Sequence, residues 1–133
     1  MSSPDAITMV EVVFPGQTNH HGTLFGGSAL AMMDKAAFVA ATRRARRTLV
    51  TVASDRVEFH APAHTGDIVE TTAEVIEVGR TSMKVRVTVA AEELLTGDRR
   101  AITSGTFTFV ALDADGRPAE IPPAGDARID SPA

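Results

Sequence analysis

A single stretch of the chain is apolar on every side of the helix that it is expected to form. From about Gly27 to Arg44 the apolar residues fall at all rotational positions of a helix: Ala29, Leu30, Ala31, Met32, Met33, Ala36, Ala37, Phe38, Val39, Ala40 and Ala41. A helix that is apolar all round is normally buried. Asp34 and Lys35 interrupt the run and arginines follow it, which argues against a membrane span. The rest of the chain is therefore expected to wrap around this helix.

The other apolar segments have the composition and spacing of β-strands. They span residues 7–14, 48–60, 68–78, 82–92 and 99–112, and turn sequences such as Thr65-Gly66-Asp67 and Thr96-Gly97-Asp98 separate them. In the fourth segment apolar residues alternate with polar ones, which predicts one buried and one solvated face. Short turns between consecutive strands indicate an antiparallel sheet, and the apolar helix is the only element available to cover its buried face.

We therefore predict an α+β fold in which an antiparallel sheet of about five strands wraps round one long central helix, the hotdog arrangement. A cystatin-like sheet is the nearest alternative, but the helix of such a sheet carries only one apolar stripe. The chain of 133 residues is expected to form a single domain over residues 1–116. Residues 117–133 contain four of the seven prolines and are expected to form an extended or disordered tail.

Asp34 is the one acid within the apolar helix. Its neighbours three and four positions away on the helix surface are Leu30, Ala31, Ala37 and Phe38, none of which is basic. Burying an unpaired carboxylate is costly. Asp34 therefore either pairs with a group from another segment, and then has only a packing role, or takes part in the chemistry.

Gly26 and Gly27 stand where the helix is expected to begin. Backbone N–H groups at a helix start have no partner within the helix and lie at the positive end of its dipole, and glycines leave them unobstructed. Asp34 follows about two turns later, roughly 10 Å along the helix axis. N–H donors for a developing oxyanion and a carboxylate that activates water are the two parts that acyl hydrolysis needs.

Composition excludes several classes of function. The net charge of −4 argues against a nucleic-acid surface. The chain has no cysteine, which excludes a thiolate nucleophile and a disulfide framework. His20 and His21 are far in the sequence from His60 and His64, so no metal site is predicted. The start of the sequence lacks a basic and apolar signal segment, so we expect a cytoplasmic location and no membrane partner.

Four arginines, Arg43, Arg44, Arg46 and Arg47, cluster at the end of the predicted helix. Cations at this position complement the negative end of the helix dipole. A contact with a phosphate of a ligand or partner is the alternative role for them.

Four segments of the chain, in this order and spacing, resemble those of the hotdog-fold acyl-CoA thioesterases, in particular the short-chain bacterial acyl-CoA hydrolases of the YciA type. The resemblance extends from about Val10 to Pro122. The matching segments are Asn19-x-x-Gly22-x-x-x-Gly26-Gly27 with Met33-Asp34; Thr51-Val52-Ala53 with Val57-x-Phe59-x-x-Pro62 and Gly66-Asp67; Val78-Gly79-Arg80-Thr81-Ser82; and Phe107-Thr108-Phe109-Val110-Ala111.

The resemblance implies roles for the residues that match. It implies that Asp34 acts as general base or nucleophile, that Asn19 of a neighbouring protomer orients water or the thioester, and that Gly26 and Gly27 supply the oxyanion N–H groups. It also implies that Gly79, Arg80, Thr81 and Ser82 meet the pantetheine and phosphates of coenzyme A. Thr23 and Phe25 are expected on the substrate side of the loop, although Thr23 and Ser28 depart from the residues common in relatives. No cofactor is implied, since coenzyme A is part of the substrate.

One curved sheet covers a wholly apolar helix incompletely, so we expect self-association into at least a dimer with shared active sites. Relatives often form hexamers, which the sequence alone does not show. Two other functions stay open. One is a hotdog domain that binds acyl-CoA without turnover, and the other is a hotdog dehydratase or hydratase acting on acyl thioesters. The second normally needs a histidine beside the acid, and none occurs past His21 in or beside the helix.

Overall fold

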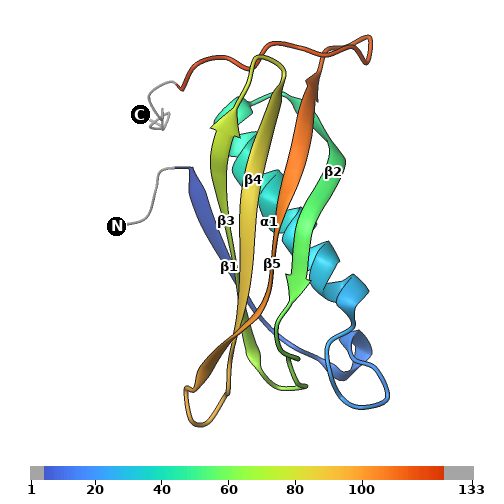
Figure 1. Cartoon of the computed structure of the whole chain (residues 1–133), viewed down its shortest axis with the longest axis vertical. Helices are drawn as coiled ribbons and strands as arrows, with labels where there is room; N and C mark the ends of the chain where they lie inside the picture. The colour runs from blue at the N-terminus through green and yellow to red at the C-terminus, as the bar shows by residue number, and fades with distance from the viewer. Residues whose placement is uncertain (1–4, 125–133) are drawn as a thin grey trace, which may run out of the picture.

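The computed structural model describes residues 5–124. These form one long helix, a short 3-10 helix and five strands, namely β1 (Ala6–Val12), η1 (Pro15–Gln17), α1 (Gly26–Ala45), β2 (Thr48–Phe59), β3 (Ile68–Val78), β4 (Ser82–Glu92) and β5 (Arg99–Leu112). All neighbouring strands pair antiparallel in a single sheet of order β1-β3-β4-β5-β2. The helix α1 runs along one face of this sheet (Figure 1). The predicted sheet of five antiparallel strands around one long helix is confirmed.

The strand boundaries agree closely with those predicted, and the differences have local causes. β1 ends at Val12, before the predicted end at residue 14, because the chain turns directly into η1 at Pro15, although the Val13 N–H still bonds to Asp67 O in the same register. Within β2, the pairing with β5 shifts register between Thr51 and Ala53 and again between Asp55 and Glu58. Arg56 has a positive φ of 51° at the second irregularity. Bulges of this kind bend a strand and re-aim its side chains.

The core lies between one face of α1 and the inner face of the sheet. The predicted inner residues of β4 are each at most 2% exposed: Met83, Val85, Val87 and Val89. The buried residues of α1 are mostly small: Ala29, Met32, Met33, Ala36, Ala37, Ala40, Ala41 and Ala45. Small residues let the helix approach the sheet closely, and at Gly105 of β5 an added Cβ would lie only 3.3 Å from Met33 Cε of the helix. The far side of α1 stays uncovered, with Phe38 45% exposed, because one sheet covers only one side of a helix.

Residues 117–124 are extended and lie against the end of the domain. Ala119 donates its N–H to Ala111 O, and Ile121 donates its N–H to Arg80 O. Arg44 of α1 donates from Nη1 to Pro122 O at 2.9 Å. The predicted tail continues to residue 133, and its part from 125 onward lies outside the described residues. Between residues 5 and 124, no helix is long and apolar enough to cross a membrane.

Candidate active site

Asp34 lies on the side of α1 that faces β2. Its Oδ1 accepts a hydrogen bond of 2.8 Å from the hydroxyl of Thr51. Asp34 is half-buried, and within residues 5–124 neither an ion pair nor a second side-chain hydrogen bond reaches it. The Thr51 hydroxyl holds Oδ1 in place and leaves Oδ2 without a partner in the described residues, so Oδ2 is the oxygen placed to accept a proton from water or attack a carbonyl carbon.

The sequence did not indicate Thr51 as the partner of Asp34. Thr51 was part of a matching motif, but nothing in the sequence fixes which side of β2 it faces. The register of β2 against β5 determines the side that Thr51 faces. Thr51 pairs with Phe109 of β5 and directly precedes the first irregularity of β2. The helical spacing had correctly shown that no basic residue on α1 itself pairs with Asp34.

The start of α1 presents free backbone donors. Phe25 occupies the N-cap position and donates its own N–H to Gln17 O, and the first intrahelical bond runs from Ala29 N–H to Phe25 O. The N–H groups of Gly26 and Gly27 therefore have no acceptor in the part of the chain that the structure describes. A Cβ added at Gly27 would meet nothing within 4 Å, and one at Gly26 would touch only the ring of Phe59 at 3.5 Å. These donors are open to a ligand and lie at the positive end of the dipole.

Asp34 and these donors belong to the same rigid helix. Asp34 is eight residues beyond Gly26, a rise of about 12 Å, and side chains on a helix tilt toward its N-terminus, which shortens the separation. The carboxylate and the donors are therefore held at fixed positions about two turns apart on one helix. The predicted oxyanion donors and the predicted carboxylate are thus both present on α1.

Asn19 organises the loop that leads into α1. Its side-chain Oδ1 accepts the N–H groups of His21 at 2.9 Å and Thr23 at 3.2 Å, and its backbone N–H bonds to Thr23 O at 2.8 Å. Gly22 closes this tight turn with a φ of 75°, a conformation that favours glycine. The amide NH₂ of Asn19 has no partner within the described residues. In one chain Asn19 therefore holds the loop and does not reach Asp34.

An apolar cavity adjoins the helix start. It has a volume of about 350 Å³, and the residues that give it its apolar character are Leu24, Ala29, Phe59, Ala61, Ala63 and Ile102, with Gly26 at its wall. Phe25 is 49% exposed next to it, and Thr23 pairs as an isolated bridge with His64. The cavity can accept an apolar group bonded to a carbonyl that the Gly26 N–H holds.

The segment Gly79–Ser82 lies at the other end of the molecule. It forms the turn between β3 and β4, closed by Gly79 N–H donating to Ser82 O at 2.7 Å, and Arg80 is exposed. This turn and the start of α1 lie at opposite ends of the molecule (Figure 1). The helix alone spans roughly 30 Å. One chain therefore does not bring the Gly79–Ser82 turn to Gly26 and Gly27.

The Gly79–Ser82 turn lies instead beside the arginines that end α1. The extended residues 117–124 connect the two, because Ile121 bonds to Arg80 O and Pro122 O accepts from Arg44. The helix ends at Ala45, and the C-cap residue Arg46 takes the left-handed conformation with a φ of 50° that glycine adopts more easily. In the described part of the chain, none of Arg43, Arg44, Arg46, Arg47 and Arg80 forms an ion pair with an acid. This arginine end, defined by these five residues, can attract an anion.

The ion pairs that are present lie away from the candidate site. Arg99 contacts Glu70 at 2.7 Å and Glu92 at 3.0 Å, and its hydrogen bond and positive charge lower the pKa of Glu70 below the ordinary value. Arg100 pairs with the buried carboxylate of Asp67, which also caps the turn before β3 by accepting the His64 N–H. No group of three or more side chains suited to hold a metal occurs within residues 5–124.

Comparison with known proteins identifies relatives of the chain. A family model described as the thioesterase superfamily matches residues 21–97. An uncharacterised acyl-CoA thioester hydrolase from Zymomonas mobilis is 41% identical over 118 residues, which are 89% of this chain and 79% of the relative. The crystal structure of an acyl-CoA hydrolase from Agrobacterium tumefaciens is 47% identical, with a TM-score of 0.83, over 91% of this chain; the chain spans only 47% of that protein. An apo-hexameric acyl-CoA thioesterase is 37% identical, with a TM-score of 0.86, over 95% of this chain and 80% of its own.

Proposed function

The chain belongs to the thioesterase superfamily, and we propose that it hydrolyses acyl-coenzyme A to a free carboxylic acid and coenzyme A, with Asp34 as the catalytic carboxylate. One observation supports this residue assignment: the same helix carries both parts that the reaction needs. Asp34 has an oxygen without a partner, and the N–H groups of Gly26 and Gly27 have no acceptor within residues 5–124. The names of the relatives support the substrate class.

The reaction suits a site with a single acid. The thioester carbonyl oxygen accepts hydrogen bonds from the Gly26 and Gly27 N–H groups, which stabilise the negative charge that develops on it. Asp34 then follows one of two routes: it removes a proton from the attacking water, or it attacks the carbonyl carbon itself and forms a mixed anhydride that water later cleaves. The leaving thiol has a pKa of about 8.5, near that of free cysteine, so the thiolate departs without a general acid. No cofactor is needed beyond the coenzyme A of the substrate.

Two features of the structure, the cavity beside Gly26 and the arginine end, suit the two ends of the substrate. The apolar cavity of about 350 Å³ beside Gly26 takes the acyl group. The arginine end, with Gly79, Thr81 and Ser82 of the neighbouring turn, takes the phosphates of coenzyme A, because guanidinium groups form strong bonds with phosphate. These two features lie too far apart in one chain, so the complete site requires a second copy.

The β2 edge, one of the two outer edges of the sheet, supports a two-fold dimer as the unit because it lies on the side of α1 that carries Asp34. β2 has no strand on its outer side in residues 5–124, and the apolar side chains Phe38, Val50 and Val52 beside it are 45%, 40% and 55% exposed. An exposed edge strand with apolar side chains is a template for pairing. A two-fold axis at this edge reverses the direction of the second chain, and so brings its arginine end beside the helix start of the first. Asn19 of the second chain then turns its free amide toward Asp34.

We further propose that such dimers associate into a hexamer, as in the hexameric relative. The proposed location is the cytoplasm, where acyl-CoA is made. The test of the activity is release of thiol from a panel of acyl-CoAs of increasing chain length, including aromatic ones. The protein has no cysteine, so a thiol reagent detects only the product. Turnover is expected. If the folded protein bound coenzyme A without releasing thiol, it would be a binding domain, and if it hydrated an enoyl-CoA, it would be a hydratase.

A further inference from the structure

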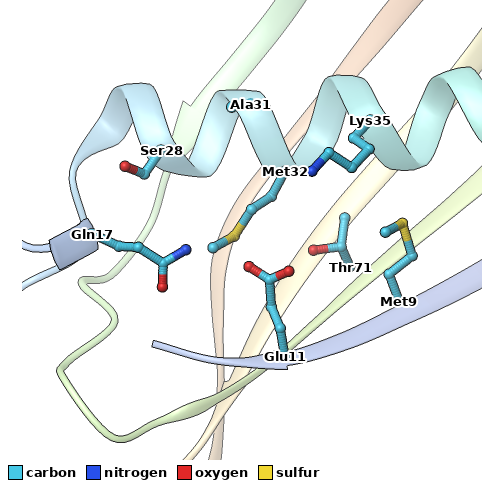
Figure 2. A pocket seen from close by; sticks show the side chains of 8 residues that line it. All are labelled: Met9, Glu11, Gln17, Ser28, Ala31, Met32, Lys35 and Thr71. Atoms are coloured by element: carbon cyan, nitrogen blue, oxygen red, sulfur yellow. The ribbon is translucent and has the colours of Figure 1, made fainter. Parts of the chain in front are cut away.

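A second cavity lies on the side of α1 away from Asp34. It has a volume of about 180 Å³ and opens between β1 and α1. Figure 2 shows polar side chains from four elements around it: Glu11 of β1, Gln17 of η1, Ser28 and Lys35 of α1, and Thr71 of β3. Since β1 and β2 are the two opposite edges of the sheet, this cavity is separate from the proposed thioesterase site.

Glu11 interrupts the apolar pattern of β1. Alternate residues of this strand face α1, and of these Ile7 and Met9 pack against the core while Val13, just beyond the strand, is 1% exposed. Glu11 therefore occupies a position where alternation predicts an apolar residue. Its carboxylate points into the cavity (Figure 2) and has no hydrogen bond or ion pair in the part of the chain that the structure describes. A partly buried carboxylate without a partner costs stability unless a ligand or water satisfies it.

Thr71 adds a hydroxyl at the floor of the cavity. The residue is 2% exposed, and its hydroxyl lies toward Glu11 in Figure 2. No hydrogen bond of this hydroxyl is present within residues 5–124. The hydroxyl faces the open cavity and is therefore available to bond with a ligand there.

The remaining polar groups supply donors across from Glu11. Gln17 uses its Oε1 to accept the Phe14 N–H at 3.0 Å, which leaves its NH₂ free to donate into the cavity. Lys35 directs its ammonium group toward the same space, and Ser28 adds a hydroxyl (Figure 2). Met9 and Met32 form apolar walls between these groups. The cavity thus offers one carboxylate, several donors opposite it, and a small apolar surface.

From this arrangement we propose that the cavity binds a small α-amino acid with an apolar side chain. Its ammonium group bonds to Glu11 and Thr71, its carboxylate bonds to Lys35, and its side chain contacts Met9 and Met32. Cavities of about 150 Å³ hold benzene, so this one accommodates roughly eight non-hydrogen atoms, the size of valine. The site is independent of the thioesterase activity.

The competing account is that Glu11 has no ligand. An inward-pointing charge on an edge strand discourages pairing with other chains, and Lys35 could turn to bond with it while water fills the space. This account predicts no amino-acid binding.

Calorimetric titration of the full chain with L-valine distinguishes the two accounts. The proposal predicts binding with a Kd of about 10 μM to 1 mM, the range expected for so small a ligand. Isovalerate lacks the amine, isobutylamine lacks the carboxylate, and phenylalanine is too large, so each should bind at least about tenfold more weakly. Absence of heat at tens of millimolar L-valine overturns the proposal.

The Glu11→Gln variant keeps the shape of the side chain and removes its charge. It should weaken L-valine binding at least about tenfold. Glu74→Gln is the matched control, since it makes the same change on an exposed part of β3, and it should leave binding unchanged. Thr71→Val and Lys35→Met should each weaken binding. Thermal unfolding confirms that every variant is folded, and equal binding by folded Glu11→Gln and by the wild type overturns the assignment of the site.

Discussion

Replacing Gly26 with proline isolates the role proposed for its N–H group. Gly26 is the first residue of α1, and proline is tolerated at this position because its missing N–H is one that the helix does not use. The preceding residue, Phe25, has φ −59° and ψ 139°, which is the conformation that a residue before proline prefers. Gly26→Pro should therefore remove one oxyanion donor and leave the helix intact.

The expected effect on catalysis is large and on stability small. Loss of one oxyanion donor typically lowers kcat about 100 to 1000-fold, which corresponds to about 2.7–4 kcal/mol of transition-state stabilisation. A compatible glycine-to-proline change alters unfolding free energy by about 1 kcal/mol or less, because the stiffer unfolded chain offsets local crowding. The ring of Phe59, 3.5 Å from a Cβ at Gly26, is at ordinary contact distance and should not obstruct the change.

The matched control is Gly26→Ala, which adds the same Cβ and retains the N–H. Thiol release from a good acyl-CoA substrate measures kcat and KM, and thermal unfolding measures stability. Gly26→Ala should keep kcat within about threefold of wild type, while Gly26→Pro should lose at least a hundredfold. If folded Gly26→Pro kept kcat close to that of Gly26→Ala, the Gly26 N–H would not be an oxyanion donor.

Three further predictions follow from the contacts of the site and of the sheet. Thr51→Val removes the hydroxyl that holds Asp34, and it should lower kcat by about five to tenfold, equivalent to the loss of a hydrogen bond of about 1 kcal/mol. The control Thr48→Val, on the same strand, should leave kcat unchanged. Equal losses of kcat in both variants would contradict the assignment of Thr51. Arg80→Ala should raise KM for acyl-CoA several-fold but leave turnover of the matching acyl-pantetheine, which lacks the phosphates, unchanged. An equal change for both substrates would show that Arg80 does not contact the phosphates. Arg99 lowers the pKa of Glu70 below 4.5, so this pair contributes stability above that value and loses it as the pH falls through the lower pKa of the folded state. The Tm difference between wild type and Glu70→Gln should therefore be small at neutral pH and vanish in acid, and a difference that grew in acid would show the opposite linkage.

The fold followed from the sequence because its strongest signals are local. The apolar helix, the alternation in β4 and the Gly-Asp turns each depend on residues close together in the chain, and each appears where expected. The end of β1 was less predictable because it depends on the pairing with β3, which lies far along the chain.

The candidate site depended on contacts that local patterns do not contain. Helical spacing showed that Asp34 lacks a partner on α1, but Thr51 reaches it only through the register of β2 against β5. The free donors at Gly26 and Gly27 were predictable, since every helix start leaves them. The separation of the Gly79–Ser82 turn from the helix start was not, because it is set by the length of α1 and the strand order together.

The most direct test of the central claim is the rate of thiol release by Asp34→Asn. Asparagine has the same shape and can still accept the Thr51 hydrogen bond, but it neither takes a proton from water nor attacks a carbonyl at a useful rate. Asp115→Asn makes the same change at an exposed turn outside the site. The account predicts that Asp34→Asn folds normally and loses at least about a hundredfold in kcat, within the range of a lost general base, while Asp115→Asn keeps wild-type kcat. Wild-type turnover by folded Asp34→Asn would contradict it.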